Sequence, residues 1–234
     1  MITLTEIHKT FDGKPILRGV NLTLPQGKST VVIGASGSGK SVLMRSILGL
    51  VTPDSGTITH QNAPLDHKAF LNDFGMLFQG AALFDSLPIW QNVAFRLLRQ
   101  MPKPCARAIA LQKLARVGLD ADVADRLPAT LSGGMQKRAG LARAIATDPS
   151  VIFFDEPTTG LDPIMARTIN TLIRDIVSET NATTLTITHD MTTVHSIADQ
   201  VALLDKGKIR WHGTPAQMAT AQDDQLKAFL FSGS

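Results

Sequence analysis

One short loop constrains the fold of this chain more than any other stretch. Residues 34–41 read Gly-Ala-Ser-Gly-Ser-Gly-Lys-Ser, which matches the pattern G-x-x-x-x-G-K-[ST]. An apolar β-branched run at 30–33 precedes the loop and a helix-like segment at 42–48 follows it, as the pattern requires. The glycines let backbone N–H groups turn inward toward phosphate oxygens, and the helix N-terminus adds a positive dipole. The sequence therefore predicts a nucleoside triphosphate site.

Two side chains of this loop have specific expected roles. Lys40 is expected to reach the β- and γ-phosphates, and Ser41 to place its hydroxyl on Mg²⁺. The other expected phosphate contacts come from the loop and the first helical residues: Gly34, Ala35, Ser36, Gly37, Ser38, Gly39 and Val42. The alternative is a glycine-rich turn that binds nothing, which the match of both flanking segments disfavours.

Composition limits the class of protein. The 234 residues are 44% hydrophobic and 18% charged, which suits a folded domain with a substantial core. Net charge is only +3 without a long Lys/Arg run, so no nucleic-acid partner is expected. The single cysteine, Cys105, excludes an internal disulfide and fits a reducing compartment. Because no signal-like segment and no run of about 18 apolar residues occurs, the chain is expected neither to cross a membrane nor to be secreted by itself.

Strand patterns surround the loop. Residues 2–7 and 20–24 alternate like half-buried strands and predict an antiparallel β layer beside the nucleotide core. Between them, Phe11 lies in a turn-rich stretch, where its ring could stack on a purine or anchor the loop to the core. An apolar strand at 74–78 ends at Gln79, whose amide could ligate Mg²⁺, position water or belong to an ordinary loop.

From about residue 81 to residue 146 the pattern is helical. Residues 90–98 and 105–117 are helix-like, and prolines punctuate the segment. This predicts a helical insertion between the strands that surround it. The stretch before the first of these helices is apolar for a surface loop, which leaves two interpretations, burial or a docking surface. Its apolar residues are Leu83, Phe84, Leu87 and Ile89.

A second glycine-rich turn opens the last helix of this segment. Ser132, Gly133 and Gly134 precede a helix expected at 136–146, with Leu141, Ala142 and Ile145 spaced for an apolar face. Bare N–H groups and the helix dipole would make this turn an anion site. The alternative is an ordinary serine N-cap followed by flexible glycines.

Two further strands end in polar residues. The apolar run at 151–154 delivers Asp155 and Glu156 to its carboxyl end. Asp155 suits the outer shell of Mg²⁺, and Glu156 suits a general base that polarises the attacking water. The strand at 184–188 ends at His189, which could donate to the γ-phosphate. Residues 201–209 predict a terminal hairpin, and residues from 217 onward predict short helices with an apolar end at 229–231.

In this order the motifs resemble those of an ATP-binding subunit of an ABC transporter, over nearly the full length of the chain. The matching segments are Walker A at 34–41, the Q-loop Gln79, the signature at 131–135, Walker B ending at Asp155-Glu156, the D-loop with Asp162 and the switch His189. The resemblance implies an α/β P-loop NTPase core, an antiparallel β subdomain and an inserted helical subdomain at about 82–146, all in a single domain, 1–234. It also implies a short C-terminal helical tail at about 215–234, an adenine-stacking role for Phe11 and a nucleotide contact for Asp162.

Within that family, three segments are similar to the MlaF-like ATPases of Mla/Mce-type lipid transporters: 76–86, 131–135 and 161–164. Met135 stands where ABC proteins generally have glutamine, and methionine is common in the Mla branch. This resemblance implies phospholipids or related lipids as cargo, an MlaE-like permease, and possible small accessory and substrate-binding subunits. It places the chain at the cytoplasmic face of the inner (plasma) membrane, as a peripheral protein.

The resemblance also implies a mechanism. Two copies would bind ATP and Mg²⁺ between them, with Ser132, Gly133 and Gly134 of one copy covering the γ-phosphate held by Walker A of the other. Loss of the γ-phosphate would then open the dimer. The alternatives are an ABC ATPase for another cargo, a DNA-repair or chromosome-organising ATPase, a translation factor or a non-hydrolysing subunit. The absence of heptads between 41 and 151, the single cassette, and the presence of Glu156 and His189 disfavour the last three.

Overall fold

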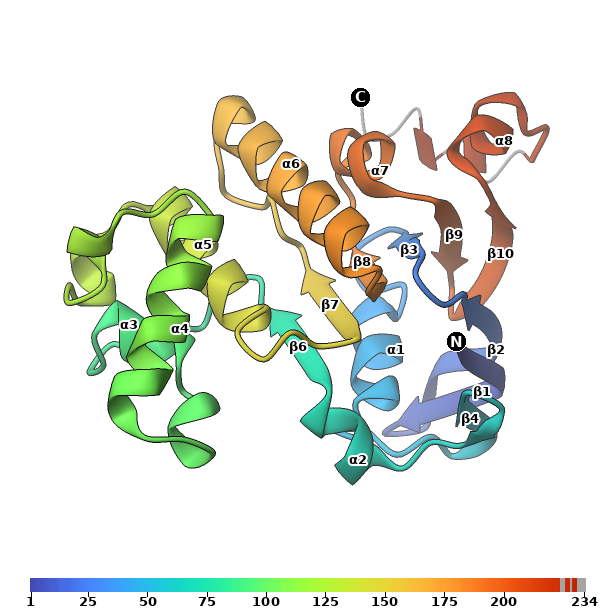
Figure 1. The fold of residues 1–234 in the computed structure, drawn as a ribbon. Coiled ribbons are helices and arrows are strands. Elements are labelled where there is room, and N and C mark those ends of the chain that lie inside the picture. The colour runs from blue at the N-terminus through green and yellow to red at the C-terminus, as the bar shows by residue number, and fades with distance from the viewer. Residues whose placement is uncertain (224–225, 228, 231–234) are drawn as a thin grey trace. The chain divides into compact units, whose positions relative to one another are not determined.

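The computed structural model describes residues 1–223, 226–227 and 229–230. They form two compact units, which Figure 1 shows as ribbons. The first unit contains Met1–Asn72 and the chain from Asn181 onward, and the second contains Asp73–Thr180. The tail predicted at about 215–234 is therefore described only in part, and residue 231 of its apolar end lies outside the described residues.

An antiparallel sheet lies in the first unit. Its strands follow the order β2 (Lys14–Leu24), β1 (Ile2–Phe11), β4 (Ser55–His60) and β5 (Ala63–Pro64). Ile2, Leu4 and Ile7 of β1 are buried, as the alternating pattern predicted. The predicted antiparallel layer is confirmed, although β1 extends to Phe11 because Asp12 and Gly13 turn the chain with φ of 48° and 75° and start the pairing with β2 there.

The first unit also contains a mainly parallel set of strands. β3 (Ser29–Ile33) pairs in parallel with both β8 (Thr183–Ile187) and β9 (Gln200–Asp205). β10 (Lys208–Gly213) pairs antiparallel with β9 and lies beside it in Figure 1, which confirms the predicted hairpin. Every residue of β3 and β8 is buried, as expected for central parallel strands. The helices of this unit are α1 (Lys40–Ile47), α2 (His67–Asn72), α7 (Met191–Ile197) and α8 (Pro215–Thr220).

The second unit contains the predicted helical insertion. β6 (Phe74–Leu77) and β7 (Val151–Asp155) pair in parallel. The elements between them are helical: α3 (Ile89–Val93), η1 (Leu97–Arg99), α4 (Lys103–Arg116), η2 (Ala121–Val123), η3 (Pro128–Thr130) and α5 (Gly133–Ala144). Figure 1 shows α3, α4 and α5 close together, and they contact one another. α6 (Pro163–Thr180) follows β7.

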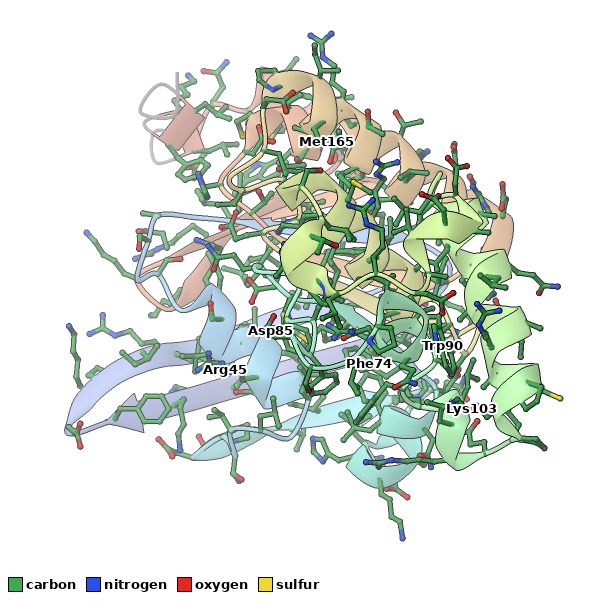
Figure 2. The ribbon with its side chains drawn as sticks, turned by 90° about the vertical axis from the view of Figure 1, so that its left-hand side faces the viewer. Arg45, Phe74, Asp85, Trp90, Lys103 and Met165 are labelled. Atoms are coloured by element: carbon green, nitrogen blue, oxygen red, sulfur yellow. The ribbon has the colours of Figure 1, made fainter. Side chains whose placement is uncertain are left out.

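Residues 90–98 do not form the single helix that their pattern predicted. The chain leaves helical geometry after Val93, where Ala94 has φ −80° and ψ 5°. Arg96 then donates a hydrogen bond to the Phe74 carbonyl. This bond ties the segment between α3 and η1 to the first residue of β6. Lys103, at the start of α4, lies beside Trp90 of α3 in Figure 2, with its Nζ 5.5 Å from the ring centroid.

The residues of the apolar stretch at 83–89 differ in burial, so burial and surface exposure each apply to part of it. Ile89 is fully buried, so it belongs to the core. Phe84 is 43% exposed, while its ring contacts Phe95 with centroids 4.5 Å apart. Within the described part of the chain, no helix combines the length and apolar character needed to span a bilayer.

Candidate functional site

The phosphate loop connects β3 to α1, and two of its glycines are required by close packing. A Cβ at Gly34 would lie 2.2 Å from the Leu204 carbonyl oxygen of β9. Gly39 caps α1 with φ 110°, and a Cβ there would lie 3.0 Å from Leu17 Cδ2 of β2. Only glycine combines this backbone geometry with such close neighbours. The loop is therefore shaped by the fold before any ligand arrives.

The interior of the loop carries donors that fit an anion. Lys40 is 9% exposed, and its Nζ donates to the carbonyls of Gly34, at 2.5 Å, and Ala35, at 3.1 Å. Ser38 Oγ is buried and has no hydrogen-bond partner among the described residues. The buried hydroxyl of Ser38 is unsatisfied, and the buried Lys40 ammonium adds a positive charge inside the loop. A phosphate oxygen would accept from the Ser38 hydroxyl and balance the Lys40 charge, so the loop fits the triphosphate of a nucleotide.

His189 leaves the same edge of the sheet as the phosphate loop. β3 and β8 are parallel, Val32 pairs with Ile187, and Thr188 N donates to Val32 O at 3.2 Å. The loop follows the carboxyl end of β3, and the exposed His189 follows that of β8. Ligands of open α/β sheets bind at this edge. The first unit thus brings together the predicted phosphate loop and the predicted switch histidine.

Phe11 is an exposed ring at the end of β1, not the core anchor that the sequence left as an alternative. Its side chain is 43% exposed, and Lys9 Nζ lies 5.3 Å from the ring centroid. Lys9 donates to Asp54 Oδ1 at 2.7 Å, and Thr10 N donates to Asp54 Oδ2 at 2.6 Å. The hydrogen bond from Lys9, followed by that from Thr10, lowers the pKa of Asp54. These contacts hold the end of β1 while leaving the ring accessible for stacking.

We expect Phe11→Ala to weaken ATP binding by about 1 kcal/mol, because the stacking area of the ring is lost. Phe11→Trp should largely restore the affinity. Leu50 is 68% exposed in the same unit, so Leu50→Ala is a matched control that should bind like the native protein. Titration calorimetry with ATP and GTP measures all four proteins. Native affinity of Phe11→Ala for both nucleotides would contradict the stacking role.

The second unit brings three predicted residues to one edge. β6 and β7 are parallel, and Leu77 pairs with Phe154. Gln79 follows the end of β6, while Asp155 and Glu156 lie at the end of β7. Two strands that are distant in sequence therefore place an amide and two carboxylates at neighbouring carboxyl ends.

Glu156 is held in an unusual backbone conformation. Its φ is 47°, in the left-handed region, which costs a non-glycine residue about 1–3 kcal/mol and persists only where the surroundings enforce it. Its Oε2 accepts a hydrogen bond from Thr159 Oγ1 at 3.0 Å. The bend turns the chain between β7 and the D-loop.

Lys137 of α5 is the residue that the sequence reasoning missed. It is 5% exposed, and its Nζ donates to the carbonyls of Gln79 and, at 3.2 Å, Glu156. Burial lowers the pKa of Lys137, and the carboxylates of Asp155 and Glu156 oppose that shift. One feature of the sequence indicated that Lys137 is buried: it lies one helical turn before Leu141, on the face of this helix that was expected to be apolar.

The signature turn begins α5 as the N-cap alternative predicted. Ser132 Oγ accepts from Met135 N at 3.3 Å. A Cβ at Gly133 would meet no atom within 4 Å, whereas one at Gly134 would lie 2.7 Å from Cγ of Met165, which Figure 2 labels on α6. Gly134 thus permits helix contact, while Gly133 leaves open space beside the N-terminus of α5. That space keeps the turn accessible to an anion.

Asp162 caps α6 in the same way. Its Oδ1 accepts hydrogen bonds from the backbone N–H groups of Ile164 and Met165, both at 3.0 Å. The carboxylate therefore has a structural function within its own unit. A nucleotide contact for Asp162 stays a prediction.

The predicted magnesium ligands are divided between the units: Ser41 belongs to the first, and Gln79 and Asp155 belong to the second. Across the described ranges there is no group of three or more His, Cys, Asp or Glu side chains that could hold a metal by themselves. Hydroxyl, amide and carboxylate oxygens are nevertheless the hard donors that Mg²⁺ takes, and one or two carboxylates suffice when phosphates complete the shell. Each unit thus carries oxygen donors of the kind that Mg²⁺ takes. A magnesium site formed by all three residues stays a prediction.

Comparison with known proteins decides the family. The model of the ABC transporter family matches residues 17–159. The chain belongs to the ABC transporter family. It is 37% identical over 238 residues to the intermembrane phospholipid transport system ATP-binding protein MlaF of Escherichia coli K12, covering 98% of this chain and 88% of MlaF.

Two further similarities agree. The chain is 35% identical over 237 residues to the probable ribonucleotide transport ATP-binding protein mkl of Mycobacterium tuberculosis H37Rv, covering 98% of this chain and 66% of mkl's length. The structure superposes with a TM-score of 0.82 on a dimeric, post-hydrolysis ATP-binding cassette, MJ0796, bound to ADP and Pi, at 29% identity and with 92% and 98% of the two chains covered. This ABC transporter subunit is an ATPase, and the predicted ABC ATPase fold is confirmed.

Proposed function

We propose that this ABC ATPase powers movement of phospholipids between bacterial membranes through an MlaE-like permease, as a peripheral protein at the cytoplasmic face of the inner membrane. The observation that carries this proposal is the 37% identity with MlaF along 98% of the chain. The methionine at position 135 of the signature supports the same branch.

The residues of each unit have definite proposed roles in ATP hydrolysis. The phosphate loop from Gly34 to Val42 binds the phosphates, Lys40 and His189 contact the γ-phosphate, and Glu156 polarises the attacking water. Ser41, Gln79 and Asp155 would hold Mg²⁺, which neutralises phosphate charge as hydrolysis proceeds. The unpartnered Ser38 hydroxyl and the buried Lys40 ammonium support the phosphate assignment.

A second copy of the chain is the proposed partner that completes each site. Ser132, Gly133 and Gly134 of one copy would cover the γ-phosphate bound by the other, which gives a closed two-fold dimer. The open space beside Gly133 supports this arrangement, because a phosphate oxygen can reach the N–H groups there. The similar cassette MJ0796 was solved as a dimer bound to ADP and Pi.

The loop before α3 is the proposed contact with the permease. Asn92 holds this loop by accepting from Phe84 N at 2.6 Å and donating to the carbonyls of Phe84, at 3.1 Å, and Leu87, at 2.9 Å. The loop is therefore rigid while the Phe84 ring stays 43% exposed. A fixed aromatic side chain on a surface is the usual anchor of a protein interface.

Reconstitution tests the cargo. The chain and its permease, placed together in vesicles, should hydrolyse ATP faster when phospholipid acceptor vesicles are present, and labelled phospholipid should move between the vesicles only with ATP. Phe84→Ser should keep the basal ATPase rate of the isolated chain but lose this stimulation. The name of mkl favours ribonucleotides as the second candidate cargo. Stimulation by ribonucleotides without phospholipid movement would replace the lipid proposal with that alternative.

A further inference from the structure

Lys137 connects two segments whose side chains the proposed reaction needs. It lies on the second turn of α5, and its buried Nζ donates to Gln79 O and to Glu156 O, the latter at 3.2 Å. Both carbonyls belong to residues just beyond the parallel strands β6 and β7. One ammonium therefore fixes the backbone at the proposed magnesium ligand and at the proposed general base.

The contact with Glu156 supports the bend in the backbone there. Glu156 has φ 47°, and its carbonyl accepts from Lys137 Nζ and from Thr159 N, at 3.3 Å. A left-handed residue keeps this conformation only when its neighbours hold it. Because the backbone direction at Glu156 sets where its carboxylate points, the lysine bond helps to aim that carboxylate.

α5 also holds the Gln79 loop independently of Lys137. Arg143 Nη1 and Nη2 donate to the carbonyls of Ala82 and Ala81, both at 2.6 Å. Ala81 and Ala82 have φ of 59° and 48°, so this part of the loop is bent and secured by its own cation. Loss of the Lys137 bonds should therefore leave the loop attached to α5 and the unit folded.

We propose that Lys137 is a positioning residue for ATP hydrolysis, which orients Glu156 and Gln79 through their backbone carbonyls. Since the signature residue Ser132 is the N-cap of α5, Lys137 also links the position of the signature turn to that of the general base. A shift of α5 moves the ammonium and, with it, both catalytic segments. This inference rests on the proposed ATPase role of Glu156.

Three substitutions test this role. Lys137→Met keeps the length of the side chain and removes all its donors, and kcat should fall about 10²-fold, the usual effect of a misplacement of about 1 Å. Affinity for a fluorescent ATP analogue without Mg²⁺ should change less than about twofold, because the Lys137 ammonium donates to Gln79 and Glu156, which lie outside the phosphate loop. Lys137→Arg restores N–H donors and should recover most of the rate. Arg138→Met, which removes a bond to the Gly118 carbonyl from the next residue of the same helix, is the matched control and should hydrolyse ATP at the native rate.

Hydrogen exchange supplies a readout that does not depend on turnover. The Thr159 amide shares the Glu156 carbonyl with Lys137. This amide should exchange faster in Lys137→Met than in the native protein, and at the native rate in Arg138→Met. A native kcat in Lys137→Met, or an equal loss in Arg138→Met, would overturn the positioning role. If the native chain itself hydrolysed no ATP, the proposed function would fail, and the exchange experiment would still decide whether Lys137 holds Glu156. Should Lys137→Met not fold, Lys137→Leu, which also removes every donor, takes its place with the same readouts and outcomes.

Discussion

Replacing Glu156 by Gln is expected to slow ATP hydrolysis by about 10²–10⁴-fold, the usual contribution of a positioned general base. The amide keeps an oxygen that can accept the hydrogen bond from Thr159 Oγ1, so the fold and the left-handed backbone should survive. ATP affinity should stay close to native, because the proposed phosphate contacts come from the loop at 34–41 and not from Glu156. ATP would then persist, and the ATP-bound dimer should accumulate.

Steady-state turnover and light scattering with Mg-ATP measure this prediction. Glu179→Gln is the matched control, since Glu179 is an exposed carboxylate of α6 that pairs with Arg116 at 2.7 Å. It should hydrolyse ATP like the native protein and return to monomer after turnover. A normal rate in Glu156→Gln, or a mutant that stays monomeric with Mg-ATP, counts against the assigned role.

Mixing two inactive chains should restore ATPase activity if each site is completed by the other copy. Lys40→Ala removes the ammonium that we propose contacts the γ-phosphate. Ser132→Asp keeps an N-cap of equal quality for α5, while its carboxylate repels the γ-phosphate. Each variant alone should be inactive. In their heterodimer, one site carries both changes and the other carries neither, so activity should reappear on mixing.

The control for this experiment is a mixture of Lys40→Ala with the native chain. That heterodimer also keeps one intact site, and its rate shows whether one site suffices for turnover. Melting curves of each variant establish that the loss of Lys40 bonds to Gly34 and Ala35 does not unfold the chain. If one intact site suffices but the two variants never rescue each other, the signature acts on its own chain and the shared-site mechanism is refuted.

Local patterns were enough to predict much of this protein. The strand, glycine-rich loop and helix from Ser29 to Ile47, the antiparallel layer, the helical insertion and the β9–β10 hairpin all follow from residue spacing and turn chemistry within a few residues. Each motif is contiguous in sequence, so it can be recognised without the structure. The order of the motifs then indicated the family. No element was predicted at 163–180, although the buried Ile169, Ile173 and Ile176 of α6 have helical spacing.

Tertiary structure decided what depends on residues far apart in the chain. Lys137, which joins Gln79 to Glu156, lies 58 positions from the first and 19 from the second. The periodicity of the sequence does not predict such a bond. The break after Val93 and the burial of Ile89 depend likewise on neighbours supplied by other elements. Phe11 shows the same division: the sequence left its ring free to stack or to anchor, and only the folded β1 and its Lys9–Asp54 pair keep that ring exposed. Spacing along the chain determines which elements form, whereas the side chains that meet depend on how those elements pack.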